Sequence, residues 1–416
     1  MSRRITISLL TLGLLGLGFL EPYTHITAAH ADGWTIDKPA IAKKHRIPTQ
    51  ESISALLEKG ELQAAEADYI DWAKAWQEDD RDLFINIETS ILQKQYKDGD
   101  KGAFIALVRA GEPSALADFT NGKVELSPEE RLIALRASGA HGGLPELANC
   151  VKLLQDPDPT VVGTAIQTMG DIGTVRYLQD LYVCARTADL KNSLLIAKTM
   201  VKIGAIKQLK ARYTLETHFP FENVVERAKL MLAAGGVPQN WPFLKKVLDE
   251  KPEKYYPLVL SALGNFNTDE ARTYVTDALK GSEAEQLYAL QSISALPEDK
   301  IDATLKGLVL KIDPDNKDSK ELLLNDQVPA SVRLAAIDLL AERGTEAAGD
   351  VLRKIGISLK GLDSDTIVTT ILALEKGGLI GDDDLRTTLL VQLANEDPKI
   401  ARAARTALLG YELNGK

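Results

Sequence analysis

The chain has 416 residues, of which 45% are hydrophobic and 26% are charged, and its formal net charge at pH 7 is −10. This length and apolar content are enough for a large folded core. The acidic balance argues against a nucleic-acid-binding protein, because such proteins gain affinity from a basic face that releases counterions. Only two cysteines are present, so the chain is not a small domain stapled by disulfides.

The first 31 residues have the layout of a secretory signal peptide. Arg3 and Arg4 precede an apolar run at 5–20, and the small-x-small sequence at 29–31 offers a cleavage site. This run is shorter than the roughly 20 residues that a membrane-spanning helix needs, and no later stretch is long enough. We expect cleavage after Ala31 and export to the periplasm or the extracellular space, by the general or the twin-arginine route. A retained anchor is the alternative.

Residues 32–100 are expected to form an extended arm followed by a helical N-terminal cap, with helices predicted at 65–76 and 81–96. Trp72 and Trp76 are four residues apart and therefore share one face of a helix. Such a pair either seals the end of a core or offers a platform for a ligand, and we favour the seal.

Residues 101–416 carry a repeated helical pattern. Asp158-Pro159 and Asp397-Pro398 each combine a helix N-cap with proline in the first turn. An apolar stripe then follows with a spacing of four, which marks one face of a helix. Its positions in the three clearest segments are Val161, Ala165 and Met169; Val332, Ala336 and Leu340; Ile400, Ala404 and Leu408.

Glycines recur at the ends of these apolar stripes, and glycine is a common helix stop. The predicted stops are Gly139, Gly170, Gly204, Gly235, Gly264, Gly344, Gly377 and Gly410. Two helices fit in each unit, for example 255–263 with 269–279, and 366–374 with 383–393. The pattern predicts an all-α chain with about nine or ten antiparallel helix pairs stacked into a curved, rod-like superhelix, an α-solenoid with a concave face.

This unit resembles the HEAT-like repeat, and its period near 31 and its Asp-Pro-x-x-Val-Arg pattern resemble the short phycobilisome-lyase-type form. Val162 and Ala401 stand where that family often has arginine. A tetratricopeptide repeat is the runner-up, but its Trp, Gly and Tyr signature is not visible. The resemblance implies an armadillo-type fold that holds a protein partner. It also implies an alternative, because the short-repeat family includes chromophore lyases, and some cell-wall lytic enzymes contain helical superhelices.

Cys150 and Cys184 are 34 residues apart, close to one repeat, so we expect them on equivalent helices of neighbouring repeats. Adjacent helix axes lie about 8–10 Å apart, whereas the Cα atoms of bridged cysteines are rarely more than about 7 Å apart. Two separate buried thiols are therefore expected, with a disulfide as the alternative.

No group of residues predicts a catalytic, cofactor-binding or metal site. None of His45, His141 and His218 lies at ligand spacing from another histidine or cysteine, so turn or surface positions are expected. The acidic residues at 313–318 suggest a calcium loop, but the glycine and the final glutamate of such a loop are missing.

Charge clusters in the sequence have structural explanations. The acidic runs 78–80 and 382–384 stand at expected helix starts, where they complement the helix dipole. The basic run 43–46 is expected to be a solvated arm. These features together predict an exported, non-catalytic scaffold that binds a protein partner of the cell envelope through residues that the sequence does not identify. An enzyme and a pure spacer are the alternatives.

Overall fold

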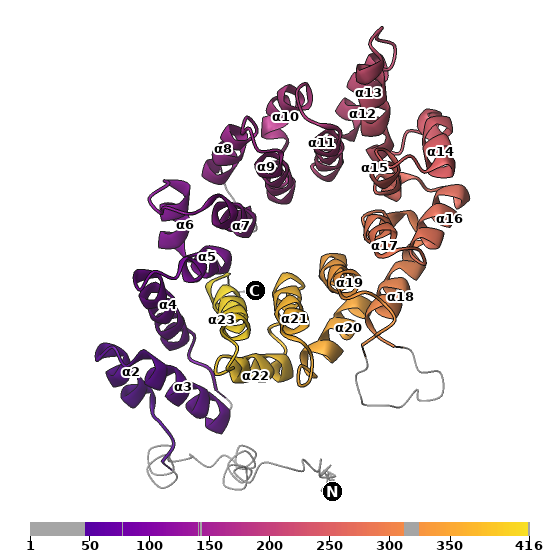
Figure 1. Cartoon of the computed structure of the whole chain (residues 1–416). Helices are drawn as coiled ribbons and strands as arrows, with labels where there is room; N and C mark the ends of the chain where they lie inside the picture. Colours follow the sequence, from indigo (N-terminus) through magenta and orange to yellow (C-terminus); the bar gives the residue numbers. More distant parts are fainter. Residues whose placement is uncertain (1–45, 77, 140, 142–143, 312–323, 415–416) are drawn as a thin grey trace, which may run out of the picture. The chain divides into compact units, whose positions relative to one another are not determined.

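A computed structural model of the chain describes residues 46–76, 78–139, 141, 144–311 and 324–414. These residues are helical and contain no strand beyond an isolated antiparallel bridge between Leu310 and Leu324, which confirms the all-α prediction (Figure 1). The predicted signal peptide, most of the basic run, His45 and the acidic segment 313–318 lie outside the described residues.

Packing divides the described residues into two compact units, which separate after Ile87, inside α4 (Arg81–Lys97). In the first unit, α2 (Gln50–Glu58) packs against α3 (Leu62–Trp76). Trp72 is buried, and the centroid of its ring lies 5.7 Å from that of the Tyr69 ring. Trp76 is partly buried and packs against a small cluster that contains Ala75. Trp72 therefore belongs to a small core rather than to an exposed ligand platform.

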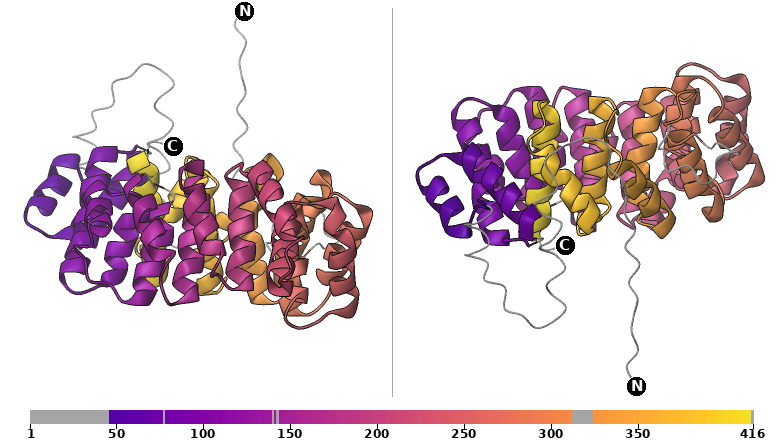
Figure 2. Two further views of the ribbon diagram at one scale, coloured as in Figure 1. Left: turned by 90° about the horizontal axis from the view of Figure 1, so that it is seen from above. Right: turned by 90° about the horizontal axis from the view of Figure 1, so that it is seen from below.

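The second unit contains two series of helices. Members of the first series pack one against the next, and each packs on a member of the second series. Between α13 and α15 this contact is extended by η4 (Leu263–Asn265), the short helix that follows α15 and also packs on α13. Figure 1 shows most of the first series towards the centre of the unit, and Figure 2 shows the helices standing side by side. The first series is α5 (Lys101–Ala110), α7 (Pro128–Gly139), α9 (Pro159–Ile172), α11 (Leu190–Lys202), α13 (Glu222–Ala234), α15 (Tyr256–Leu260), α17 (Glu283–Leu290), α19 (Ala330–Arg343), α21 (Ser364–Lys376) and α23 (Pro398–Asn414). The second series is α6 (Pro113–Thr120), α8 (Leu144–Leu153), α10 (Leu178–Ala185), α12 (Ile206–Glu216), α14 (Trp241–Glu250), α16 (Asp269–Ala278), α18 (Glu298–Val309), α20 (Glu346–Gly356) and α22 (Asp383–Gln392).

The helix starts follow the sequence pattern. Asp158 is the N-cap of α9, and its carboxylate accepts a 2.8 Å hydrogen bond from the backbone N–H of Thr160. Asp397 accepts in the same way from Lys399 at the start of α23. The nine predicted stripe positions are all buried, between 0% and 9% exposed, because the stripe faces the neighbouring helices.

The predicted glycines have two different roles, since some end a helix and others allow two helices to pack closely, and the sequence pattern does not distinguish the two. Gly344 lies in the left-handed region, with φ of 60°, and ends α19 as predicted. Gly170 and Gly410 were wrongly predicted as stops, since α9 and α23 continue through them. A Cβ at Gly170 would lie 3.3 Å from the Thr199 hydroxyl of α11, so this glycine allows close packing of two helices.

The described chain of the second unit closes on itself. The last helix, α23, packs against α5 as well as α21, so the series has no free end, unlike the rod expected from the repeats (Figure 1). We call the α23–α5 contact the seam. Each helix pair is rotated slightly relative to the one before it, and the sum of these rotations determines whether the stack stays open or closes. The period of the sequence repeat does not reveal these rotations.

Candidate functional site

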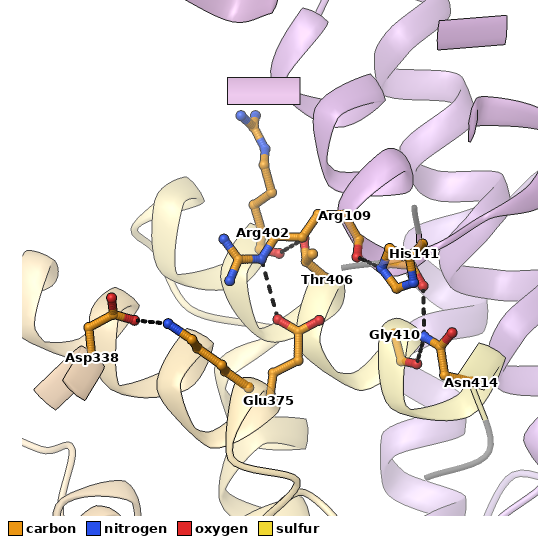
Figure 3. A network of polar contacts seen from close by, with 10 residues as sticks. Arg109, His141, Asp338, Glu375, Arg402, Thr406, Gly410 and Asn414 are labelled. Carbon is orange, nitrogen blue, oxygen red and sulfur yellow. Dashed lines mark hydrogen bonds and ion pairs between the residues drawn. The ribbon is translucent and has the colours of Figure 1, made fainter. Parts of the chain in front are cut away.

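A polar network beside the seam joins α5, α19, α21 and α23, as Figure 3 shows. The Nε of Arg109 lies 3.3 Å from a carboxylate oxygen of Glu375. The ammonium group of Lys376 lies 3.0 Å from Asp338 and 2.9 Å from Glu342. Burial opposes the charge on Lys376, but these two carboxylates raise its pKa above the usual value. In these ion pairs each cation has a carboxylate partner, so we interpret the network as a structural connection between the helices.

His141, expected in a turn, contributes to the same region. Its Nε2 lies 2.6 Å from the backbone carbonyl of Arg109, which can only accept, so Nε2 carries the proton. The imidazole packs against Gly111, where an added Cβ would lie 2.8 Å from the ring and where φ is 84°. His141 therefore fastens the end of α5 and is not placed as a metal ligand. His218 is exposed in the α12–α13 loop, as expected.

Ion pairs on α23 complete the seam. Arg405 pairs with Glu88, and the two side chains are 6% and 1% exposed. Arg402 pairs with Asp100, and its guanidinium occupies the place that a Cβ of Gly102 would need. These partners are about 300 residues apart in the sequence, so the pairs hold the two ends of the second unit together.

A second feature is an apolar surface on the α12–α13 hairpin. Leu215, Phe219 and Phe221 are 68%, 49% and 62% exposed and lie within seven residues. We call them the apolar hairpin. Large apolar side chains that gather on an exposed loop are typical of contact surfaces for other macromolecules. The sequence signal for this surface is the pair of phenylalanines that flanks Pro220.

A third feature is a hollow of about 230 Å³ between α6, α7 and α8. Its apolar lining includes Phe119, Leu135 and Leu153, and the cationic side chains Arg131 and Lys152 lie on its wall. Cations beside an apolar floor can hold a small organic anion. The hollow is open and small, and no sequence motif indicated it.

Glu285 at the start of α17 is a carboxyl group with a strongly lowered pKa. It accepts hydrogen bonds from Lys251 at 2.8 Å, from the Ser282 backbone at 3.1 Å and from Tyr256 at 2.9 Å. These donors lower its pKa from 4.5 to about 2. The arrangement forms a capping box that also ties α17 to the residues before and within α15.

We expect Glu285→Gln to lower the free energy of unfolding at pH 7 by about 1 kcal/mol. Because the folded pKa is depressed, the carboxylate stabilises the fold fully above its ordinary value near 4.5, and this contribution is lost as the pH falls towards 2. Urea unfolding of both proteins between pH 7 and pH 3 measures the difference, which should shrink with acidification. Asp118→Asn, which removes an exposed pair with Lys123, is the control and should show a smaller effect. A pH-independent difference would contradict this account.

The cysteines lie as expected on equivalent helices of neighbouring pairs, α8 and α10, which are successive members of the second series. Cys150 and Cys184 are both buried and are not bridged to each other. Burial raises the pKa of the Cys184 thiol, which lowers its reactivity. Asp382 likewise fulfils the predicted helix-start role, because its carboxylate accepts from the backbone N–H groups of Asp384 and Leu385.

Within the described residues there is no group of three or more His, Cys, Asp or Glu side chains arranged to hold a metal ion. None of the helices in the described part of the chain is long and apolar enough to cross a membrane. No protein-family model matches the chain, and a search of curated proteins finds no significant sequence similarity.

Proposed function

We propose that this protein is an exported, non-catalytic binding scaffold built from HEAT-like repeats, and that it holds a protein partner in the cell envelope. The observation that carries the proposal is the apolar hairpin, where Leu215, Phe219 and Phe221 leave about half or more of their surface exposed. A few residues near the centre of an interface supply most of its binding energy, and aromatic side chains, phenylalanine included, are enriched in interfaces. The repeat pattern and the N-terminal layout of the sequence support the remaining parts of the proposal.

The seam supports a scaffold in a second way. A surface that is held in place loses little conformational entropy when a partner binds. The ion pairs on α23 and the contacts between successive helices of the first series give the hairpin a fixed base, since α12 and α13 pack against each other and α13 packs on α11.

The test is a capture experiment that compares variants. The protein, tagged after Lys416 and purified from its own source, is incubated with envelope extract, and bound proteins are quantified. The triple substitution Leu215→Ser, Phe219→Ser and Phe221→Ser should reduce recovery of a stoichiometric partner by about tenfold or more, because each buried side chain of this size contributes about 1.5–3 kcal/mol.

The matched control is Ile357→Ser with Val391→Ser. These side chains are 51% and 49% exposed, comparable with Phe219, and lie after α20 and on α22, away from the hairpin in the chain. The control should retain the partner. Equal recovery by both variants would exclude the hairpin as the docking surface, and absence of any stoichiometric partner would refute the scaffold proposal.

A further inference from the structure

Lys198 on α11 contacts a neutral amide, whereas lysines such as Lys202 and Lys376 pair with carboxylates. Its side chain is partly buried, and its Nζ hydrogen-bonds to the side-chain oxygen of Gln291 at 3.2 Å. Gln291 is the C-cap of α17, so this bond connects two helices of the first series that are separated by α13 and α15. Gln291 is itself exposed, so a small molecule can approach the amine.

The partner of Lys198 is a neutral amide, and no carboxylate lies within ion-pair distance of it among the residues that the structure describes. Lys202, one turn further along α11, instead pairs with Asp171 of α9 at 2.6 Å. Burial without a compensating negative charge lowers the pKa of Lys198 to about 8. Roughly a tenth of its amine is therefore neutral at pH 7, against less than about 0.1% for an ordinary lysine.

Two further lysines lie on the same face of α11 as this amine. Lys191 and Lys202 lie seven residues before and four residues after Lys198, so the three share a face of the helix. Lys191 is exposed, and no carboxylate pairs with it in the described part of the chain. On the neighbouring helices, Asp171 is held by Lys202, and Arg227 of α13 donates to the backbone carbonyl of Arg186. An anionic group near Lys198 would thus be attracted by Lys191.

We propose that Lys198 is a covalent binding site for small aldehydes or ketones that carry a negative charge. The neutral amine attacks the carbonyl carbon and forms an N–C bond, while the C=O π electrons move to the oxygen, which takes one of the two amine protons to give a carbinolamine. The hydroxyl group then leaves with the second nitrogen proton as one water molecule, which gives a neutral imine with no net oxidation or reduction. Gln291 positions the nitrogen and Lys191 attracts the anionic group. This site is independent of the apolar hairpin.

Pyridoxal 5′-phosphate is a suitable probe because it combines an aldehyde with a phosphate. The full chain is incubated with substoichiometric probe at pH 7.5, the imine is fixed with borohydride, and modified lysines are located by peptide mass spectrometry. We expect Lys198, which is partly buried, to be modified about tenfold faster than Lys207 or any of the exposed lysines. Pyridoxal without the phosphate should react more slowly at Lys198, with little change at other lysines.

Three variants test the role of Lys198 and control for the fold and for simple charge. Lys198→Met should abolish the preferential labelling, whereas Lys202→Met, on the same face, should retain it. Gln291→Leu should change the rate at Lys198 without unfolding the protein, as judged by circular dichroism. Labelling of Lys198 in the folded wild-type protein at the rate of the exposed lysines would overturn the proposal, whatever the variants do.

Discussion

Arg405→Ala is expected to lower the free energy of unfolding by about 3–5 kcal/mol, since it removes one member of a buried ion pair. The Glu88 carboxylate that faces this guanidinium is 1% exposed and would lose a charged hydrogen-bond donor without gaining access to water. Urea unfolding monitored by circular dichroism measures the change. Because the pair connects α4 with α23, amide hydrogen exchange in α5 and α23 should also accelerate, as the seam loosens before the rest of the unit.

The control for this prediction is Arg353→Ala. Arg353 pairs with Asp350 and Asp382, but its side chain is 39% exposed, so we expect a loss of less than about 1 kcal/mol. The double substitution Arg405→Met with Glu88→Leu should recover part of the loss, since it removes both buried charges. If Arg405→Ala cost no more than Arg353→Ala, the pair would not hold the seam.

The local architecture could be predicted from the sequence because its causes are local. An aspartate before proline caps a helix wherever it occurs, and a stripe at a spacing of four must be buried by something, so Asp158, Pro159 and Val161 lie as expected. The acidic run that ends at Asp80 shows the same rule, since its carboxylate accepts from the backbone of Leu83 at the start of α4.

The seam could not be predicted, because its partners are remote in the sequence and unremarkable in composition. Nothing in the neighbourhood of Arg402 or Arg405 indicates that their carboxylates lie at Asp100 and Glu88. Only the accumulated rotation of the intervening helices brings them together. Lys198 was missed for a related reason, since the absence of a counterion is a property of its surroundings and not of its sequence context.

Gly410 shows that a glycine near the end of an apolar stripe does not always end a helix, because it lies inside α23 and allows close packing there. A Cβ at this position would lie 2.8 Å from a carboxylate oxygen of Glu375 and 3.5 Å from the Cα of Ala110. Glu375 belongs to α21 and Arg109 to α5, so their ion pair passes over α23 where the glycine leaves room (Figure 3). We therefore expect Gly410→Leu to destabilise the fold by about 1–3 kcal/mol through overpacking against the α5 backbone.

Alanine substitutions make this test specific. Glycine inside a helix ordinarily costs about 0.5–1 kcal/mol relative to alanine. Gly349 in α20 has room for a Cβ, whose nearest neighbour, a Leu379 methyl, would lie at 3.6 Å, so Gly349→Ala should raise the free energy of unfolding by that amount. Gly410→Ala should show no such gain, because the Glu375 carboxylate must shift away from Arg109. If Gly410→Ala and Gly349→Ala raised the free energy of unfolding equally, Gly410 would have room for a Cβ beside Glu375. The close packing of α23 against the Arg109–Glu375 ion pair would then be refuted.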